Sequence, residues 1–165
     1  MYIYPHKLDN KGNYPLKSDF SVNNREKEKG YGVYTRKDSK RGSFVARFTG
    51  ELSPEIVQHS LQASPDLHLY DPYFSGLLLH SCDPNIVLDM QDFTIWAIKD
   101  INGGDALTMD YASTEDYLFK QFKCLCGSDN CRHWVTGRRE SVNEEGSLWL
   151  QKYQTDSELL VLKTG

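Results

Sequence analysis

Three of the four cysteines in this 165-residue chain lie within a stretch of eight residues. One residue separates Cys124 from Cys126, and four residues separate Cys126 from Cys131. Tetrahedral zinc takes four ligands, with thiolate sulfurs at about 2.3 Å, and a tight group of cysteines plus one distant cysteine satisfies it. The residues at 127–130, GSDN, suit a turn that returns Cys131 to the pair. The spacing therefore predicts a metal site in this part of the chain.

Cys82, 42 residues before Cys124, is the remaining cysteine, and spacing alone leaves open whether it is the fourth ligand. Two disulfides, or a redox pair, are the alternatives for four cysteines. The chain begins MYIYPHK, without the basic and apolar regions of a secretory signal, so we expect an intracellular location, cytoplasmic or nuclear. Disulfides rarely persist there, and a C-x-C pair is an unusual redox motif. These points favour the metal site.

Charge and hydropathy argue against two classes of partner. The formal net charge is −4 at pH 7, whereas nucleic-acid-binding domains usually carry a basic surface. No apolar run approaches the roughly 20 residues that a membrane span needs. We therefore expect neither nucleic acid nor membrane as a partner. The length fits one structural domain with a single hydrophobic core.

Short β-branched and aromatic segments between turn signals predict a mainly β domain. The expected strands cover residues 30–35, 43–48, 86–90, 93–99 and 106–111. The third and fourth of these predict a hairpin around Gln91 and Asp92. Residues 1–29 are polar and rich in turns, and their charged end is expected to be a solvated loop before the first strand.

Helices are expected to be few and short. Ser53 as an N-cap and Pro54 in the first turn predict a helix over residues 53–61. Residues 63–76 contain two prolines and a glycine, which predicts an irregular segment. Residues 148–153 predict a second short helix, and the apolar run at 158–162 is expected to pack back on the body.

Several motifs occur in an order that resembles the SET-domain methyltransferase family. They are GYG at 30–32, FTGE at 48–51, HSCDPN at 80–85, LTMDY at 107–111 and CLCGSDNC at 124–131. The resemblance runs from about residue 30 to residue 137. It implies a mainly β, SET-type fold of several short sheets with a knot-like crossing, a few short helices and a zinc-bound post-SET tail.

The resemblance also implies a division of the chain within one structural domain. Residues 1–29 would be an N-terminal polar segment and residues 30–117 the SET core. Residues 118–137 would be the zinc-binding post-SET tail, and residues 138–165 a C-terminal extension. In this family the cysteine of the HSC motif joins the three tail cysteines on one structural zinc ion, which implies that the ligands are Cys82, Cys124, Cys126 and Cys131.

The family uses S-adenosylmethionine as its methyl donor, and the matching positions imply a cofactor site and a catalytic residue. The implied cofactor-binding residues are Gly30, Tyr31, Gly32, Leu79, His80, Tyr111 and Leu125. Tyr111 would be the catalytic residue, orienting the nucleophile and polarising the methyl group through its hydroxyl. The knot-like crossing would place His80 and Tyr111 side by side.

The chain departs from the family pattern around the acceptor. Leu79 replaces an asparagine that helps hold the cofactor. Of the two candidates for the substrate channel, Phe48 replaces a tyrosine and lacks its hydroxyl, and Met109 replaces an aromatic residue of the family. Only 28 residues lie between Glu51 and His80, fewer than in relatives that act on proteins. We expect a protein-lysine methyltransferase whose partner is a protein lysine, for example in a histone-like tail. The alternatives are a small-molecule carboxylate or amine acceptor, and a non-catalytic interaction module.

Overall fold

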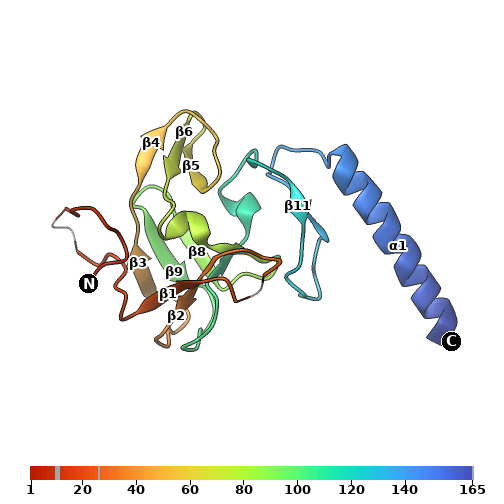
Figure 1. Ribbon diagram of the computed structural model, residues 1–165, viewed down its shortest axis with the longest axis horizontal. Helices are drawn as coiled ribbons and strands as arrows, with labels where there is room; N and C mark the ends of the chain where they lie inside the picture. The colour runs from red at the N-terminus through yellow and green to blue at the C-terminus, as the bar shows by residue number, and fades with distance from the viewer. Residues whose placement is uncertain (10–11, 26, 165) are drawn as a thin grey trace.

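The computed structural model describes residues 1–9, 12–25 and 27–164, and in this part short strands form five small sheets (Figure 1). The pairs are β1 (Phe20–Asn23) with β2 (Gly32–Thr35), β7 (Leu79–His80) with β10 (Thr108–Met109), and β11 (Phe122–Lys123) with β12 (Trp134–Val135). The three-stranded sheets are β3 (Phe44–Arg47), β9 (Thr94–Ala97) and β8 (Ile86–Asp89), and β4 (Glu51–Ser53), β6 (Leu67–Tyr70) and β5 (Ser60–Ser64). The prediction of a mainly β fold is confirmed.

The hairpin of β8 and β9 forms as its pattern predicts. Ile86 and Leu88 are buried while Val87 and Asp89 are exposed, which is the period-two alternation of a strand with one face on the core. The two strands pair antiparallel, with Leu88 opposite Ile95. Phe93, in the turn, has a φ of 52°, and its backbone carbonyl accepts the Phe48 N–H at 2.8 Å. The hairpin is thereby joined to the end of β3.

The N-terminal segment contributes to the core more than its polarity predicts. The first strand is β1, which starts at Phe20 and not after residue 29. Tyr4, Tyr14 and Phe20 belong to the buried core cluster, and the Phe20 ring packs edge-on against Phe74 with centroids 5.2 Å apart. Single aromatic rings among polar residues carry no periodic signal, so their burial could not be read from the pattern.

The predicted helix over residues 53–61 is wrong. Ser53 ends β4, and Ser60 begins β5. The Ser60 hydroxyl both donates to the Val57 carbonyl and accepts the Val57 N–H, which closes a turn, and the φ of 70° at His59 is incompatible with a helix. The segment 63–76 is also less irregular than expected, because it contains β6 and the 3-10 helix η1 (Ser75–Leu77).

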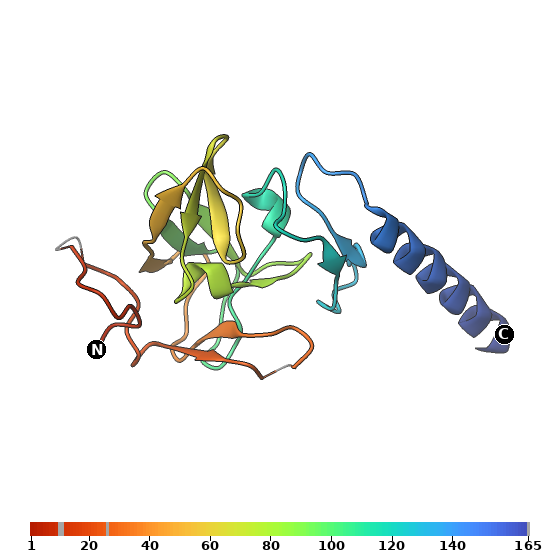
Figure 2. The ribbon, with the colours of Figure 1, turned by 45° about the horizontal axis from the view of Figure 1, so that its top comes forward.

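The C-terminal helix α1 (Glu144–Thr164) is longer than predicted and extends away from the body (Figures 1 and 2). Its first part is anchored, because the Trp149 indole donates to the His133 carbonyl and Tyr153 stacks on His133 at 3.8 Å. The side chains of Leu159 and Leu162 are 49% and 78% exposed. The expectation that residues 158–162 pack back on the body is therefore wrong. No helix in the described ranges is both long and apolar enough to cross a membrane.

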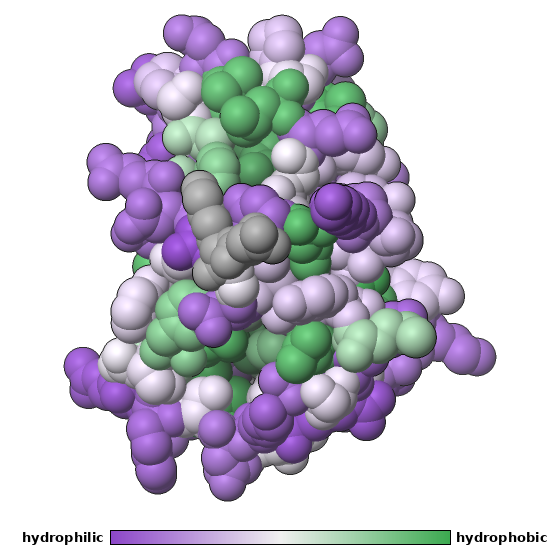
Figure 3. Space-filling view, turned by 90° about the vertical axis from the view of Figure 1, so that its left-hand side faces the viewer, coloured by the Kyte–Doolittle hydropathy of each residue, from purple (hydrophilic) through white to green (hydrophobic). Residues whose placement is uncertain are grey.

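The face of the body that points away from α1 carries hydrophobic residues in separate areas, divided by hydrophilic side chains (Figure 3). Scattered apolar residues of this kind are normal on a protein surface.

The parallel pair β7–β10 joins two segments far apart in the chain. The Ser81 N–H donates to the Met109 carbonyl at 3.0 Å. Asn85 reinforces the pair, since its amide oxygen accepts the Thr108 N–H and its amide nitrogen donates to the Ala106 carbonyl, both at 2.8 Å. A second 3-10 helix, η2 (Tyr111–Ser113), follows β10. This pairing fixes the positions of His80 and Tyr111.

Candidate functional site

A cavity of about 570 Å³ lies between the sheet of β4, β6 and β5, the β7–β10 crossing and the tail segment at 118–126. Its lining comes from residues 28–31, 56–61, 75–80, 109, 111, 115, 118–120 and 122–126. Volumes of roughly 300–1,000 Å³ are typical of sites for small molecules and cofactors. The cavity is therefore large enough for a ligand of that class.

Most of the residues predicted for the cofactor site and channel come together at this cavity. Those that line it are Gly30, Tyr31, Leu79, His80, Met109, Tyr111 and Leu125. Gly32 and Phe48 are absent from the lining. Phe48 is 1% exposed, and its ring packs against Phe93 with centroids 5.7 Å apart, so its described contacts are those of a core residue.

Gly32 does not line the cavity, but it packs against Leu79, which does. A Cβ atom placed on Gly32 would come within 2.7 Å of the Leu79 Cδ1 atom, so the missing side chain leaves the space that Leu79 fills. Leu79 is 8% exposed and lines the cavity. The hydrophobic residue at position 79 is thus matched to the glycine at position 32.

Gly32→Ala is expected to push the Leu79 side chain toward the cavity and to destabilise the protein by about 1–3 kcal/mol, the usual range for an overpacked core. Chemical denaturation measures the loss. Adding Leu79→Ala to this variant removes the clash, and a double-mutant cycle is expected to show that the two changes are strongly coupled. Additive losses would contradict the contact.

Tyr111 lines the cavity and contacts two other lining residues, Leu78 and His80. Its hydroxyl donates to the Leu78 carbonyl at 2.7 Å, and its backbone N–H donates to His80 Nδ1 at 3.2 Å. Burial, and secondarily the charge of Glu115, raise the pKa of the phenol above its ordinary value. Tyr111 is therefore a neutral phenol at physiological pH, with its hydroxyl held in one direction.

His80 lies beside Tyr111, with the ring centroids 5.2 Å apart, and this predicted adjacency is confirmed. Because Nδ1 accepts the Tyr111 N–H, the ring proton is on Nε2, which lies 3.4 Å from the Cys82 sulfur. Burial lowers the pKa of His80 to about 4, so the imidazole is neutral at physiological pH. His80 thus connects the Tyr111 backbone to the cysteine cluster.

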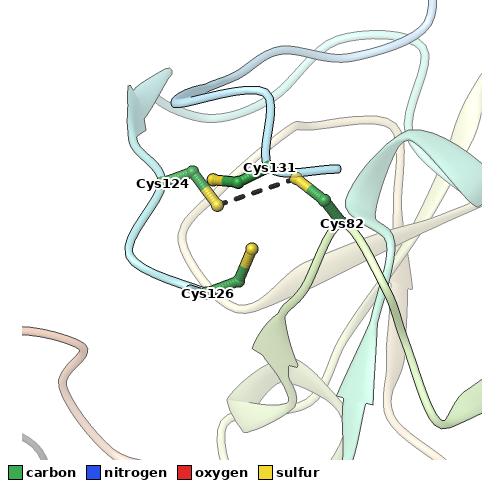
Figure 4. A group of neighbouring side chains, drawn as sticks. All are labelled: Cys82, Cys124, Cys126 and Cys131. Atoms are coloured by element: carbon green, nitrogen blue, oxygen red, sulfur yellow. Dashed lines mark hydrogen bonds between the residues drawn. The ribbon is translucent and has the colours of Figure 1, made fainter. Parts of the chain in front are cut away.

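The four cysteines converge at one end of the cavity (Figure 4). Their Sγ atoms all lie within 4.8 Å of one another, and the sulfurs of Cys82 and Cys124 are 3.8 Å apart. Four sulfurs at about 2.3 Å from a tetrahedral metal have edges of about 3.8 Å. None of the four is in a disulfide. The arrangement fits a tetrahedral metal ion, and the structure brings Cys82 to the three tail cysteines, as the resemblance implied.

Hydrogen-bond donors around the sulfurs fit a charged cluster. The Arg132 N–H points to the Cys82 sulfur at 3.3 Å, and the His133 N–H points to the Cys131 sulfur at 3.4 Å. Burial raises the pKa of the Cys124 thiol. At Cys126 burial acts in the same direction, but hydrogen bonds from Ser128, the Cys82 backbone and Cys124 together outweigh it and bring the pKa to about 5. Several close thiolates repel one another, and a bound cation removes that penalty.

An ion pair between Arg132 and Asp110, which the sequence did not indicate, connects the tail to the segment that follows β10. The Arg132 Nη2 atom lies 2.6 Å from an Asp110 carboxylate oxygen, and the Asn130 amide donates to the Cys82 carbonyl at 3.0 Å. Asp110 also accepts the Ala112 N–H at 3.0 Å, at the start of η2. The position of Arg132, next to Cys131, was the signal that could have found this contact.

Glu115 is the other functional candidate that the motifs did not indicate. It lines the cavity, yet the residue is only 5% exposed. Its two carboxylate oxygens accept the Gln62 N–H at 3.0 and 2.9 Å. Burial raises its pKa. A single glutamate outside a motif carries no sequence signal, and only folding shows that it is buried in a cavity.

Comparison with known proteins connects this geometry to a family. The SET domain family matches residues 30–112. The methyltransferase flvH of Aspergillus flavus is 30% identical over 121 residues, covering 70% of this chain and 67% of that protein. The H3 lysine-9-specific histone-lysine N-methyltransferase dim-5 of Neurospora crassa is 28% identical, covering 67% of this chain. The chain spans 49% of the length of dim-5 and 6% of the variant-silencing SET domain-containing protein of Plasmodium falciparum, which is 28% identical.

Solved structures with the same fold include KRYPTONITE in complex with mCHG DNA and SAH, at a TM-score of 0.57 and 24% identity. That match covers 67% of this chain and 27% of KRYPTONITE. The methyltransferase domain of human SETMAR has a TM-score of 0.57 and 20% identity, covering 72% of this chain and 58% of that one. At this identity the two structures support the fold.

Proposed function

Because the chain belongs to the SET domain family, we propose that it is a methyltransferase that takes S-adenosylmethionine as methyl donor and a protein lysine as acceptor. The observation that carries the proposal is the cavity lined by Tyr111, whose hydroxyl is held by the Leu78 carbonyl. Relatives named as histone-lysine methyltransferases support the lysine acceptor. The domain boundaries predicted from the motifs remain part of this proposal.

The residues at one end of the cavity fit the methyl donor. Gly30 has a φ of 78°, and a Cβ atom there would meet no described atom within 4 Å, so the turn leaves an open space beside the lining. Tyr31, His80 and Leu125 line the same cavity. We infer that these residues hold the cofactor, and a solved relative, KRYPTONITE, was determined with SAH. When bound, the cofactor supplies an electrophilic methyl group on a sulfonium.

The contribution of the protein is mainly to position the reacting groups. The Tyr111 hydroxyl is fixed by the Leu78 carbonyl and is buried, so its dipole has one orientation. We propose that it orients the acceptor nitrogen. Met109, buried beneath the cavity, would limit the room around that nitrogen.

We infer that the metal of the cysteine cluster is zinc and that it is structural. Four cysteine thiolates are a common ligand set for structural zinc, and they leave no open position for catalysis. The tail residues from Phe122 to Cys126 are part of the cavity lining. The zinc would therefore hold one wall of the cofactor site in place.

The acceptor has a second candidate of a different class. The 28 residues between Glu51 and His80 form two strands, a short 3-10 helix and turns, which leaves little chain for a peptide groove. The relative flvH, of which the chain covers 67%, is named as a methyltransferase without a histone acceptor. A small molecule with an amine or a carboxylate is the corresponding alternative. An intracellular location, and the expected lack of nucleic-acid and membrane partners, remain predictions.

Cofactor binding and acceptor class can be tested separately. Calorimetry with S-adenosylhomocysteine is expected to show binding at one site, and the absence of binding at millimolar ligand would leave only the non-catalytic interaction module. Incubation with methyl-labelled cofactor is then compared between denatured protein extract and metabolite extract. Label in lysine residues of protein supports the proposal, whereas label in the small-molecule fraction alone would assign the second candidate.

A further inference from the structure

Glu115 is a buried carboxylate that forms no salt bridge with a described residue, although the Arg138 charge acts on it from beyond salt-bridge distance and opposes the rise in its pKa that burial causes. The nearby Arg138 guanidinium bonds instead to Asp116 at 3.1 Å and to the Thr114 carbonyl at 3.2 Å. The donor to the Glu115 carboxylate is the Gln62 N–H, while the Thr114 hydroxyl donates to the Tyr111 carbonyl at 3.5 Å. Each carboxylate oxygen has more than one acceptor site, so capacity remains for a cation in the cavity.

The position of Glu115 separates it from the proposed cofactor residues. Its backbone N–H donates to the Tyr111 carbonyl at 2.9 Å, so it lies one turn beyond Tyr111. Its side chain is bonded to β5, the strand that adjoins the cavity wall formed by residues 56–61. The proposed cofactor residues come from other segments of the same lining, namely the turn before β2, strand β7 and the tail. Glu115 thus lines the cavity one turn from the proposed catalytic residue, on a different segment from the proposed cofactor residues.

A purely structural role does not account for the charge. The Gln62 side chain is held in place without Glu115, because its amide nitrogen donates to the Asp116 carboxylate at 3.0 Å and its amide oxygen accepts the Asp116 N–H at 2.7 Å. A neutral glutamine at position 115 could also accept the Gln62 N–H. Burying an ionised carboxylate is costly, whereas a neutral acceptor would make the same bond at a smaller cost. Within the fold the charge is favoured only by Arg138, which lies beyond salt-bridge distance, so a cationic ligand in the cavity would stabilise the carboxylate further.

We propose that Glu115 makes the cavity selective for an amine acceptor, which it binds in the ammonium form. This inference rests on the methyltransferase function proposed above, and it names the acceptor class within it. It excludes a carboxylate acceptor, because two carboxylates at one buried site repel each other. It applies equally to a lysine side chain and to a small amine.

The same contact provides a route for the proton that must leave before methyl transfer. The ammonium N–H bond breaks, an O–H bond forms on the Glu115 carboxylate, and the electron pair stays on nitrogen as the nucleophile. Burial favours this direction, because it disfavours both the ammonium and the carboxylate relative to the neutral amine and acid. The raised pKa of Glu115 is consistent with a group that can hold the proton.

Binding of small probes tests the selectivity without turnover. The protein saturated with S-adenosylhomocysteine is titrated with n-butylammonium, with butyrate as the matched anion, and binding is followed by NMR. We expect wild-type protein to bind n-butylammonium more tightly than butyrate, and Glu115→Gln to lose about tenfold or more in affinity for n-butylammonium, as for other hydrogen bonds to charged groups. Glu55→Gln removes an exposed carboxylate outside the lining and is expected to bind like wild type.

Folding and pH dependence separate this role from a structural one. Glu115→Gln keeps an acceptor for Gln62 and removes a buried charge, so its melting temperature at pH 7 is expected not to fall below that of wild type. For methyl transfer to an amine, the deficit of Glu115→Gln in kcat/KM is expected to shrink as pH approaches the amine pKa of about 10.4, where the acceptor arrives neutral. A deficit that is constant with pH would overturn the proton route.

The outcomes also distinguish this inference from the proposed function. Failure of the wild-type protein to bind S-adenosylhomocysteine would overturn the methyltransferase proposal itself. Cofactor binding together with equal affinity of wild type and Glu115→Gln for n-butylammonium would overturn only the role of Glu115. Tighter binding of butyrate than of n-butylammonium would overturn the amine selectivity.

Discussion

Cys126→Ser is expected to release the metal ion and to unfold the tail that follows Phe122. The four sulfurs lie within 4.8 Å of one another, and removing one leaves three thiolates that are incomplete as a tetrahedral site. Metal binding to structural zinc sites contributes about 10–16 kcal/mol in zinc-finger peptides, so even a fraction of that is large for one domain. Residues 122–126 line the cavity, and affinity for S-adenosylhomocysteine is therefore expected to fall with the metal.

Metal analysis, hydrogen exchange over residues 122–135 and calorimetry measure these three effects in one sample. Asp129→Ala is the matched control, because it alters an exposed residue of the same turn while keeping all four thiols and the Ser128 hydroxyl beside Cys126. A strong chelator added to wild-type protein is expected to reproduce the loss of protection in the tail. A Cys126→Ser protein that keeps one metal ion and wild-type cofactor affinity would contradict the structural role of the site.

Tyr111→Phe is expected to lower kcat by about a hundredfold or more, the usual cost of removing a preorganised polar group from an active site. Cofactor affinity is expected to change little, because Tyr31, His80 and Leu125 still line the proposed cofactor site and the aromatic ring of Tyr111 remains. The ring packs on His80 and Phe122 at 5.2 and 5.7 Å, and the backbone contact to His80 does not involve the hydroxyl. Loss of the bond to Leu78 is expected to cost about 1 kcal/mol of stability.

Single-turnover kinetics and calorimetry with S-adenosylhomocysteine distinguish the two effects of Tyr111→Phe. Tyr34→Phe is a suitable control, because Tyr34 is 4% exposed and its hydroxyl has no hydrogen-bond partner among the described residues. That change removes a buried phenol hydroxyl outside the cavity and is expected to leave kcat unchanged. Parallel losses of turnover and cofactor affinity in Tyr111→Phe would instead make Tyr111 a residue of binding or folding.

Local patterns were sufficient where a strand has one buried and one exposed face. Strand β8 is the clearest case, since its alternation depends only on neighbouring residues and its pairing with β9 on a short turn. Residues 53–61 show the opposite case. Ser53 and Pro54 favour the start of a helix, but the turn closed by Ser60 and the pairing of β5 with β6 outweigh that local preference.

The long helix α1 and the buried N-terminal rings were beyond a local reading for different reasons. Helix α1 continues beyond Tyr153 with exposed leucines, so its second half has no apolar face to predict. Tyr4 is buried, and its hydroxyl donates a hydrogen bond to the carboxylate of Asp71, 67 residues away in the chain, at 2.7 Å. Contacts at that separation depend on the whole fold.

The spacing of the cysteines predicted the metal site, and the ordered motifs identified the family, because covalent spacing limits which side chains can meet. Tertiary structure brought Cys82 to the three tail cysteines, joined that cluster to Tyr111 through His80, and showed that Gly32 supports the cavity wall while Phe48 packs in the core. It also placed the Glu115 carboxylate in the cavity. Burial and the distances between remote segments are properties of the folded chain, and they determine which charges a ligand can reach.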